Sequence, residues 1–486
     1  MDLAVGFDLD MTLVDSREGI AATVQAALAD WGVSLTAAQI WPSMGMPLDV
    51  VLAPHVPAAD LGAAMARYRE LYPLLAVPCS RLLPGARELV SAVRAMHGRV
   101  VVVSAKQEGA VRLVLAQVGL DADVVVGELF AADKGIALRE HGVSIYLGDH
   151  VGDVLGALSA GALAVGVATG PADAQALRAA GADLVVDSLL DAAPWVADRV
   201  LDARLDALAS RLTGLGSVLV AFSGGADSAL LLAAAVRALG PERVVAATAV
   251  SGSLATGELD GAAAFAARLG VRHLTPGTDE LAREGYRANS AERCFFCKAE
   301  LLDVLAPLAS ALGLARVATG TNADDAVAGF RPGIRAAAER GAVAPLLDAG
   351  LTKSQVRAAS ARWGLPTWDK PAAACLSSRI AYGVAITTAG LARVDAAESG
   401  CRQVLREAGI DVRDVRVRDL GADQARLEID RTALAAVGAH DGCPQALLDA
   451  LGQAGFSAAQ IDPRGFRSGS MNELLAGAAA GPEPTR

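Results

Sequence analysis

The sequence has few cysteines, no long hydrophobic run and no excess of positive charge. Six cysteines in 486 residues are too few for a disulfide framework, so a reduced protein is expected. No apolar run approaches the ~20 residues that span a bilayer. Strand-like sequence begins directly at the N-terminus, which leaves no room for a signal peptide. We therefore expect a cytoplasmic protein that does not engage a membrane.

Composition limits the other classes of function. A formal net charge of −11 argues against a general nucleic-acid binder, because phosphate contacts need clustered Lys and Arg. With 53% hydrophobic and 20% charged residues, the chain suits a globular protein. At 486 residues it is too long for one ordinary core, so two or three domains are expected.

The most informative stretch is a Ser-Gly-Gly-Ala-Asp-Ser turn between two apolar runs. The run before it, 218–221, predicts a buried parallel strand, and the Ala/Leu-rich run 229–236 predicts a helix. The glycines permit tight dihedrals, and the hydroxyls with the helix-start N–H groups can hold a phosphate. The candidate phosphate-binding residues are Ser223, Gly224, Gly225, Asp227 and Ser228.

This turn lacks the lysine of the Walker pattern and resembles the pyrophosphate loop of the ATP-pyrophosphatase family. That resemblance implies an enzyme that splits ATP into AMP and pyrophosphate to activate a carboxylate or carbonyl oxygen. Strand-like runs at 244–250 and 317–319 alternate with a helical run at 262–269. We therefore expect a doubly wound parallel sheet over residues 196–370, with the ligand at the carboxyl ends of the strands.

The first third of the chain carries acidic residues at strand ends. Asp8 and Asp10 follow the strand-like run 3–7, and two carboxylates two residues apart can share a Mg²⁺ ion. Three further pieces follow in order, namely Ser104 after a valine run, Lys134, and the second acidic pair Asp149 and Asp153. The alternative is a set of solvated acids, which this ordered series disfavours.

The four-part series resembles the haloacid dehalogenase (HAD) superfamily, in its phosphoglycolate-phosphatase-like branch. The resemblance implies a Rossmann-like domain over 1–195 with a helical cap over about 16–80. It implies that Asp8 is the nucleophile and Asp10 the general acid/base. It further implies that Ser104 and Lys134 hold the phosphate, and that Mg²⁺ is bound by Asp8, Asp10, Asp149 and Asp153. The cap selects the substrate, which the sequence does not reveal.

Two cysteine motifs follow. Cys294 and Cys297 form a C-x-x-C, but there is no second such pair and the nearest histidine is His273, which disfavours structural zinc. We favour two partly buried thiols at a helix start and leave a metal cluster open. Cys375 precedes Ser377, Ser378 and Arg379, where a thiolate would be stabilised. A small buried loop residue is the alternative.

Six motifs follow one another in the chain, at residues 223–228, 293–298, 320–325, 331–333, 349–353 and 374–379. In this order they resemble LarE, the ATP-dependent sacrificial sulfur transferase family of nickel-pincer nucleotide biosynthesis. The match runs from about residue 201 to Glu473 and ends in the motif 468–473. The resemblance implies that ATP adenylylates a carboxylate of pyridinium-3,5-biscarboxylic acid mononucleotide, with Asp227 near Mg²⁺. Cys375 then attacks the acyl-adenylate and gives up its sulfur. Some family members instead hold a [4Fe-4S] cluster with three cysteines, and Cys294 and Cys297 keep that route open.

Three more residues match positions of that family. Glu398 matches an acidic residue assigned to the metal, and Arg416 and Arg418 match a pair suited to a nucleotide phosphate, as does Arg379. The segment between Glu398 and Arg416 is longer than the family pattern and contains Cys401. A smaller α+β domain is expected over 371–476, followed by a disordered tail over 477–486.

The whole sequence therefore predicts an α/β protein in which a phosphatase is fused to a sulfur transferase that binds small-molecule nucleotides. The phosphatase would remove pyrophosphate or trim a phosphorylated nucleotide. Two other functions stay open, an amidotransferase or ligase with a structural Cys375, and a nucleotide-sensing scaffold. The family resemblance implies a homo-oligomer, expected to be a hexamer.

Overall fold

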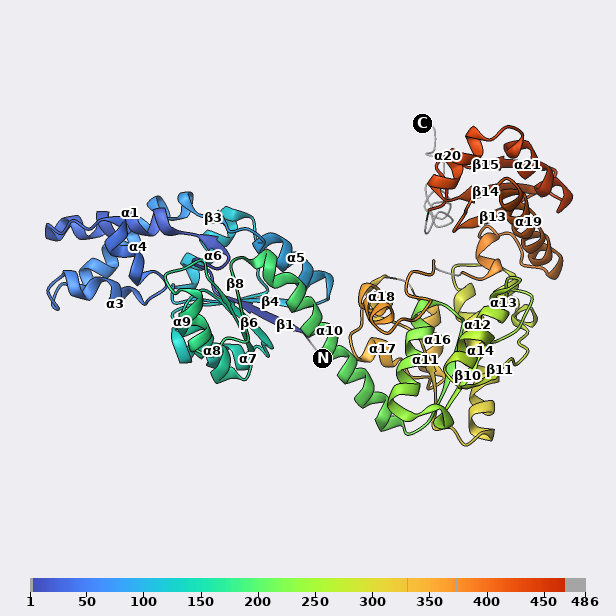
Figure 1. The fold of residues 1–486 in the computed structure, drawn as a ribbon, viewed down its shortest axis with the longest axis horizontal. Helices are drawn as coiled ribbons and strands as arrows, with labels where there is room; N and C mark the ends of the chain where they lie inside the picture. The colour runs from blue at the N-terminus through green and yellow to red at the C-terminus, as the bar shows by residue number, and fades with distance from the viewer. Residues whose placement is uncertain (1–2, 330, 372–373, 468–486) are drawn as a thin grey trace, which may run out of the picture. The chain divides into compact units, whose positions relative to one another are not determined.

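A computed structural model describes residues 3–329, 331–371 and 374–467 (Figure 1). The predicted tail 477–486 and the motif at 468–473 lie outside these residues. The chain divides into two compact units, Met1–Ala203 and Arg204–Arg486. The division falls inside one helix, α10 (Leu189–Leu215), which contains Pro194. The expected domain boundary between residues 195 and 196 lies inside this helix, which continues on both sides of the proline.

The N-terminal unit is built on a six-stranded sheet in the order β5-β4-β1-β6-β7-β8. Every neighbouring pair is parallel, and Gly6 of β1 aligns with Val101 of β4 and Tyr146 of β6. The strands are β1 (Ala4–Phe7), β4 (Arg99–Val103), β5 (Val124–Val126), β6 (Ile145–Gly148), β7 (Leu163–Val167) and β8 (Leu184–Val186). Its helices are α5 (Ala86–Ala95), α6 (Glu108–Val118), α7 (Lys134–Glu140), α8 (Val151–Ala160) and α9 (Ala174–Ala179). This confirms the expected Rossmann-like sheet.

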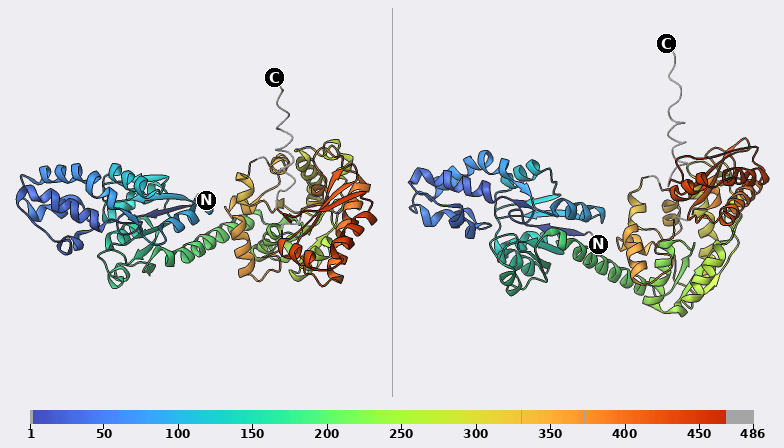
Figure 2. Two further views of the ribbon diagram at one scale, coloured as in Figure 1. Left: turned by 90° about the horizontal axis from the view of Figure 1, so that it is seen from above. Right: turned by 45° about the horizontal axis from the view of Figure 1, so that its top comes forward.

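Four helices between β1 and β4 form a cap, drawn in blue in Figure 2. They are α1 (Arg17–Leu28), α2 (Ala37–Ile40), α3 (Leu48–Leu52) and α4 (Leu61–Leu75). The short antiparallel pair β2 (Val14–Asp15) and β3 (Arg81–Leu82) joins the cap to the core. A Cβ at Gly19 would lie 2.6 Å from the Ala76 Cα, so glycine permits α1 to pack this closely. The cap thus occupies the stretch 16–80 that the sequence assigned to it.

The C-terminal unit contains a second parallel sheet in the order β11-β10-β9-β12. Its strands are β9 (Val218–Ala221), β10 (Val244–Ala247), β11 (Arg272–Leu274) and β12 (Arg316–Thr319). Helix α11 (Ala226–Leu239) buries most of its length, which explains the apolar run 229–236 within it. The main helices around it are α12 (Glu258–Arg268), α14 (Arg293–Ala311), α16 (Pro332–Glu339) and α18 (Lys353–Arg362).

A mixed three-stranded sheet ends the described chain, and it belongs to the same compact unit. The predicted boundary near residue 371 therefore falls inside the C-terminal unit. The sheet consists of β13 (Val415–Gly421), β14 (Gln424–Ile429) and β15 (Ala458–Ile461). It shares a core with α19 (Thr388–Glu407) and α21 (Cys443–Gln453), in which Val394, Val417 and Leu427 are fully buried. None of the helices that the structure describes is long and apolar enough to cross a membrane.

Candidate active sites

Three buried carboxylates meet at the carboxyl ends of two neighbouring strands in the N-terminal unit. Asp8 follows β1, Asp149 follows β6, and Asp153 lies in the first turn of α8. One oxygen from each lies within 4.8 Å of the others. Such like charges repel unless a cation lies between them, and carboxylate oxygens are the ligands that Mg²⁺ prefers. The three residues therefore fit a divalent metal, as the sequence predicted for them.

Lys134 neutralises part of this charge. Its Nζ donates to Asp8 Oδ1 and Asp153 Oδ1, each at 2.6 Å, and to Tyr146 Oη at 3.1 Å. Burial disfavours the charged ammonium, but Asp153 and Asp8 outweigh burial and raise the pKa of Lys134 well above its ordinary value. Burial also raises the pKa of Asp8 to about 7, against the attraction of Lys134. A bound cation would favour the ionised Asp8 carboxylate, which is the nucleophilic form.

Asp10 lies apart from the three-carboxylate cluster. Its Oδ2 is bound by the ammonium of Lys106, and its Oδ1 is buried without a hydrogen-bond partner among the described residues. Asp10 is not in the group of carboxylates whose oxygens lie within 4.8 Å of one another, and its expected role as a metal ligand stays a prediction. Ser104 is buried after β4, and its Oγ accepts a bond from the Lys106 N–H at 3.3 Å. Asp8, Asp10, Ser104 and Lys106 all line one cavity of about 410 Å³.

In the C-terminal unit, the phosphate loop 223–228 joins β9 to the N-terminus of α11. Gly224 has φ = 71°, which favours glycine, and Ser223 Oγ lies 3.1 Å from Ser228 Oγ. A Cβ at Gly320 would lie 2.8 Å from the Ser228 nitrogen, so β12 ends in close contact with the loop. The loop presents backbone N–H groups and hydroxyls at the positive end of a 14-residue helix, an arrangement that binds phosphate.

Two side chains from elsewhere in the C-terminal unit, Asn322 and Lys370, donate hydrogen bonds to this loop. Asn322 Nδ2 donates to Asp227 Oδ1 at 2.9 Å. Burial raises the pKa of Asp227, and the bond from Asn322 and the charge of Lys353 oppose this shift. Lys370 Nζ donates to the Gly224 carbonyl at 3.1 Å and to Glu258 Oε2 at 2.8 Å. The local sequence does not identify Lys370 as a partner of this loop.

Cys375 and the phosphate loop line the same cavity, which has a volume of about 430 Å³. The thiol is exposed, and its Sγ lies 2.9 Å from Ser377 Oγ, which in turn accepts from Tyr286 Oη at 2.9 Å. Arg379 was expected to stabilise the thiolate. Its guanidinium instead donates to the Cys375 carbonyl at 2.9 Å, so it holds the backbone of the loop.

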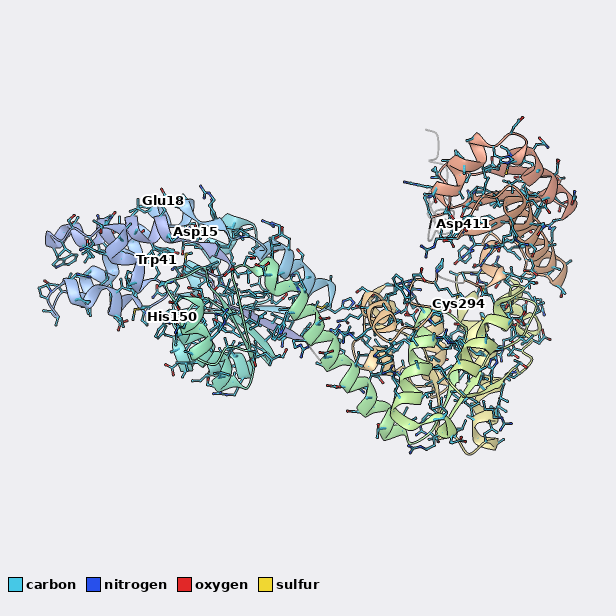
Figure 3. All side chains as sticks on the ribbon, viewed as in Figure 1. Asp15, Glu18, Trp41, His150, Cys294 and Asp411 are labelled. Carbon is cyan, nitrogen blue, oxygen red and sulfur yellow. The ribbon has the colours of Figure 1, made fainter. Side chains whose placement is uncertain are left out.

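Cys297 lines that cavity as well. Burial raises the pKa of Cys297, the neighbouring Cys375 and Glu280 raise it further, and Lys298 lowers it. Cys294, labelled in Figure 3, is exposed and also belongs to the first turn of α14. The predicted helix start is therefore confirmed, but Cys294 is exposed and not partly buried as expected. Among the described residues, the sulfur atoms of Cys294, Cys297 and Cys375 do not all lie within 4.8 Å of one another.

Glu398, which was expected to bind a metal, is paired with an arginine. It is buried, and its Oε1 accepts from Arg379 Nε at 2.9 Å and from the Val417 N–H at 3.1 Å. An arginine compensates its charge, and the expected metal role stays a prediction. Arg416 and Arg418 lie on one face of β13, and each is paired with an acid, Asp414 at 3.0 Å and Glu428 at 2.9 Å. Burial lowers the pKa of both arginines.

The chain thus contains two α/β units, each with its own site. The N-terminal unit holds a carboxylate cluster, and the C-terminal unit holds a phosphate loop beside a cysteine. The haloacid dehalogenase-like hydrolase family matches residues 5–167. A phosphoglycolate phosphatase of Xanthomonas campestris is 30% identical over 32% of this chain and 79% of its own length.

Two other relatives match a larger share of the chain. An uncharacterised protein of Synechocystis is 41% identical over 57% of this chain and 99% of its own. The pyridinium-3,5-bisthiocarboxylic acid mononucleotide synthase of Lactiplantibacillus plantarum is 33% identical over 55% of this chain and 93% of its own. The chain therefore belongs to the LarE family in its C-terminal part and carries a haloacid dehalogenase-like hydrolase domain at its N-terminus.

Proposed function

We propose that the C-terminal unit is an ATP-dependent sulfur transferase that converts a carboxylate of pyridinium-3,5-biscarboxylic acid mononucleotide to a thiocarboxylate. The observation that carries this proposal is the shared cavity of Cys375 and the phosphate loop. A thiol beside a triphosphate site can reach an acyl-adenylate formed there. The relative from Lactiplantibacillus plantarum, a synthase of the bisthiocarboxylic acid mononucleotide, supports the choice of substrate.

The chemistry takes two transfers and one elimination. A substrate carboxylate oxygen attacks the α-phosphorus of ATP, and the pyrophosphate leaves into the N–H groups of Ser223–Ser228. The Cys375 sulfur, having lost its proton, attacks the acyl carbon, and AMP leaves with the bonding electron pair. Loss of the Cα proton then breaks the Cβ–S bond, whose electrons stay on sulfur. The products are a thiocarboxylate and dehydroalanine at residue 375. The Asp227 carboxylate fits Mg²⁺, which would neutralise charge on the phosphates.

Two variants separate the steps. Asp227→Asn should abolish AMP formation from ATP and the biscarboxylate mononucleotide. Cys375→Ala should still form the adenylate but yield no thiolated product. Cys79→Ala, in the N-terminal unit, is the matched control and should behave as the wild type. A thiolated product from Cys375→Ala would refute Cys375 as the sulfur donor, and ammonia-dependent amide formation would restore the ligase alternative. ATP binding without any turnover would favour the sensing scaffold.

A second route uses an iron–sulfur cluster, and the observation that favours it is the presence of Cys297 in the same cavity as Cys375. The three sulfurs are too far apart for one ion, but a [4Fe-4S] cluster holds its thiolates on separate iron atoms. Anaerobic reconstitution with iron and sulfide tests it. Iron bound by the wild type and lost in Cys297→Ala, but kept in Cys401→Ala, would support the cluster. Equal iron in both variants would exclude it.

We also propose that the N-terminal unit is a Mg²⁺-dependent phosphatase. Asp8 attacks the phosphorus to form an aspartyl-phosphate, while Asp10 donates a proton to the leaving oxygen and later activates water. Ser104 and Lys134 bind the phosphoryl oxygens. The cluster of Asp8, Asp149 and Asp153 fits Mg²⁺, which would neutralise charge on the transferred group.

Hydrolysis of p-nitrophenyl phosphate tests this activity directly. Asp8→Asn should abolish it, whereas Asp15→Asn should not. Asp15 pairs with Arg17 outside the cluster and is labelled in Figure 3. Activity that survives in Asp8→Asn would refute the aspartyl-phosphate route.

We propose that the chain acts on nucleotides as a homo-oligomer, expected to be a hexamer. Light scattering in solution would measure its mass.

A further inference from the structure

The cavity above the carboxylate cluster is large and mostly lined by the cap. Its volume of about 410 Å³ falls within the ~300–1,000 Å³ of pockets that enclose drug-sized ligands. Three methionines line it, Met44 and Met46 between α2 and α3, and Met65 from α4. Methionine side chains adapt to flat and irregular apolar surfaces. The cavity therefore offers far more apolar surface than a phosphate group with a few attached atoms would cover.

The charges of this cavity do not favour a second anionic group. Four carboxylates line it, those of Asp8, Asp10, Asp49 and Glu128, but only two cations do so in the described part of the chain. Lys106 is bound by Asp10, and Arg69 lies 3.9 Å from Glu128. A carboxylate on the leaving group would meet no cation without an acidic partner. An uncharged leaving group would avoid that repulsion.

One hydroxyl in the cavity wall has no protein partner. Tyr72 is 3% exposed, and its Oη makes no hydrogen bond to any described residue. The ring of Tyr72 packs against that of Tyr68, with centroids 5.7 Å apart. An unpaired buried hydroxyl is costly, and a ligand hydroxyl would satisfy it.

We infer that this cavity binds a phosphomonoester whose leaving group is uncharged, about as large as a nucleoside, able to lay one flat face against the methionines, and hydrogen-bonded to Tyr72 Oη. The inference rests on the proposed phosphatase activity and names its substrate class. A nucleoside 5′-monophosphate meets each requirement, because its base can lie against the methionines and its ribose carries hydroxyls. Phosphoglycolate and pyrophosphate do not, since each adds a second anionic group to a carboxylate-rich cavity.

The full-length protein with Mg²⁺ is tested on AMP, 2-phosphoglycolate and phenyl phosphate. We expect kcat/KM for AMP to exceed that for 2-phosphoglycolate by about tenfold or more. Equal or higher kcat/KM for 2-phosphoglycolate would overturn the inference but leave the phosphatase standing. Absence of hydrolysis of all three compounds would overturn the phosphatase itself, and the inference with it.

Variants test the named contacts. Tyr72→Phe should lower kcat/KM for AMP roughly three- to tenfold more than kcat/KM for phenyl phosphate, because phenol has no second hydroxyl to bond Tyr72 Oη. An equal loss for both substrates would refute the hydrogen bond.

Met46→Arg, at a partly exposed loop position, should move the preference toward 2-phosphoglycolate. Leu74→Arg is the matched control, because Leu74 lies on the cap, is 69% exposed and does not line the cavity. This variant should keep the wild-type preference. An unchanged preference in Met46→Arg would contradict the electrostatic argument.

Discussion

Replacing Glu398 by glutamine distinguishes two roles of this residue. One is the metal ligand expected from the sequence, and the other is the ion pair with Arg379 seen in the structure. The side chains of Arg379 and Glu398 are only 4% and 8% exposed, and Nε lies 2.9 Å from Oε1. The guanidinium also donates to the Cys375 carbonyl. Glu398→Gln keeps the shape of the side chain but removes the charge that compensates Arg379.

The magnitude follows from this burial. Removing one partner of a buried ion pair leaves the other charge uncompensated, which costs about 3 kcal/mol or more. For a unit of this size, that loss lowers the midpoint of thermal unfolding by roughly 6–12 °C. The exposed pair of Arg393 and Asp423 supplies the control, because Asp423 is 61% exposed. Asp423→Asn should cost less than about 1 kcal/mol.

Differential scanning calorimetry of the full chain measures the shift, and hydrogen exchange assigns it to a unit. Peptides from α19 and β13 should exchange faster in Glu398→Gln, and peptides from the N-terminal unit should not change. If Glu398→Gln unfolds within about 2 °C of the wild type but needs more Mg²⁺ for AMP formation, the ion-pair argument is refuted. Glu398 would then be a metal ligand.

Three further predictions concern single side chains. Iodoacetamide near neutral pH should alkylate Cys294 much faster than Cys297, because burial raises the pKa of Cys297 and keeps it protonated to higher pH. Equal alkylation rates of the two cysteines, measured by peptide mass spectrometry, would contradict this prediction. Lys134→Met should lower phosphatase kcat by about 100-fold or more, because it removes the cation shared by Asp8 and Asp153; a wild-type rate would refute that role. Lys370→Ala should raise the KM for ATP about tenfold without changing phosphatase activity, because Lys370 holds the loop; an unchanged KM would oppose it.

Local sequence was sufficient where one short segment sets the position of a functional residue. A run of buried strand residues followed by an acid or a serine predicted the ends of β1, β4 and β6, and with them Asp8, Ser104 and Asp149. The phosphate loop was equally legible, because a strand, two glycines and a helix start are contiguous. These features need no knowledge of distant partners.

Long-range partners could not be predicted in this way. Lys370 and Gly224 are 146 residues apart, and no local pattern links a lysine to a distant carbonyl. Lys106 pairs with Asp10 across 96 residues for the same reason. Glu398 was assigned to a metal from the family resemblance, and its pairing with Arg379 could not be seen in the local sequence, because a glutamate on a helix has the same local pattern whether it binds a cation or an arginine. Only packing against Arg379 decides between the two.

The central claim is that Cys375 supplies the sulfur, and mass spectrometry of the protein after turnover tests it most directly. The full chain is incubated with ATP, Mg²⁺ and the biscarboxylate mononucleotide, and its intact mass and peptides are measured. Loss of H₂S (~34 Da) at Cys375, matched by one thiocarboxylate formed per chain, is the predicted result. Thiolated product with an unchanged Cys375 would contradict the sacrificial transfer.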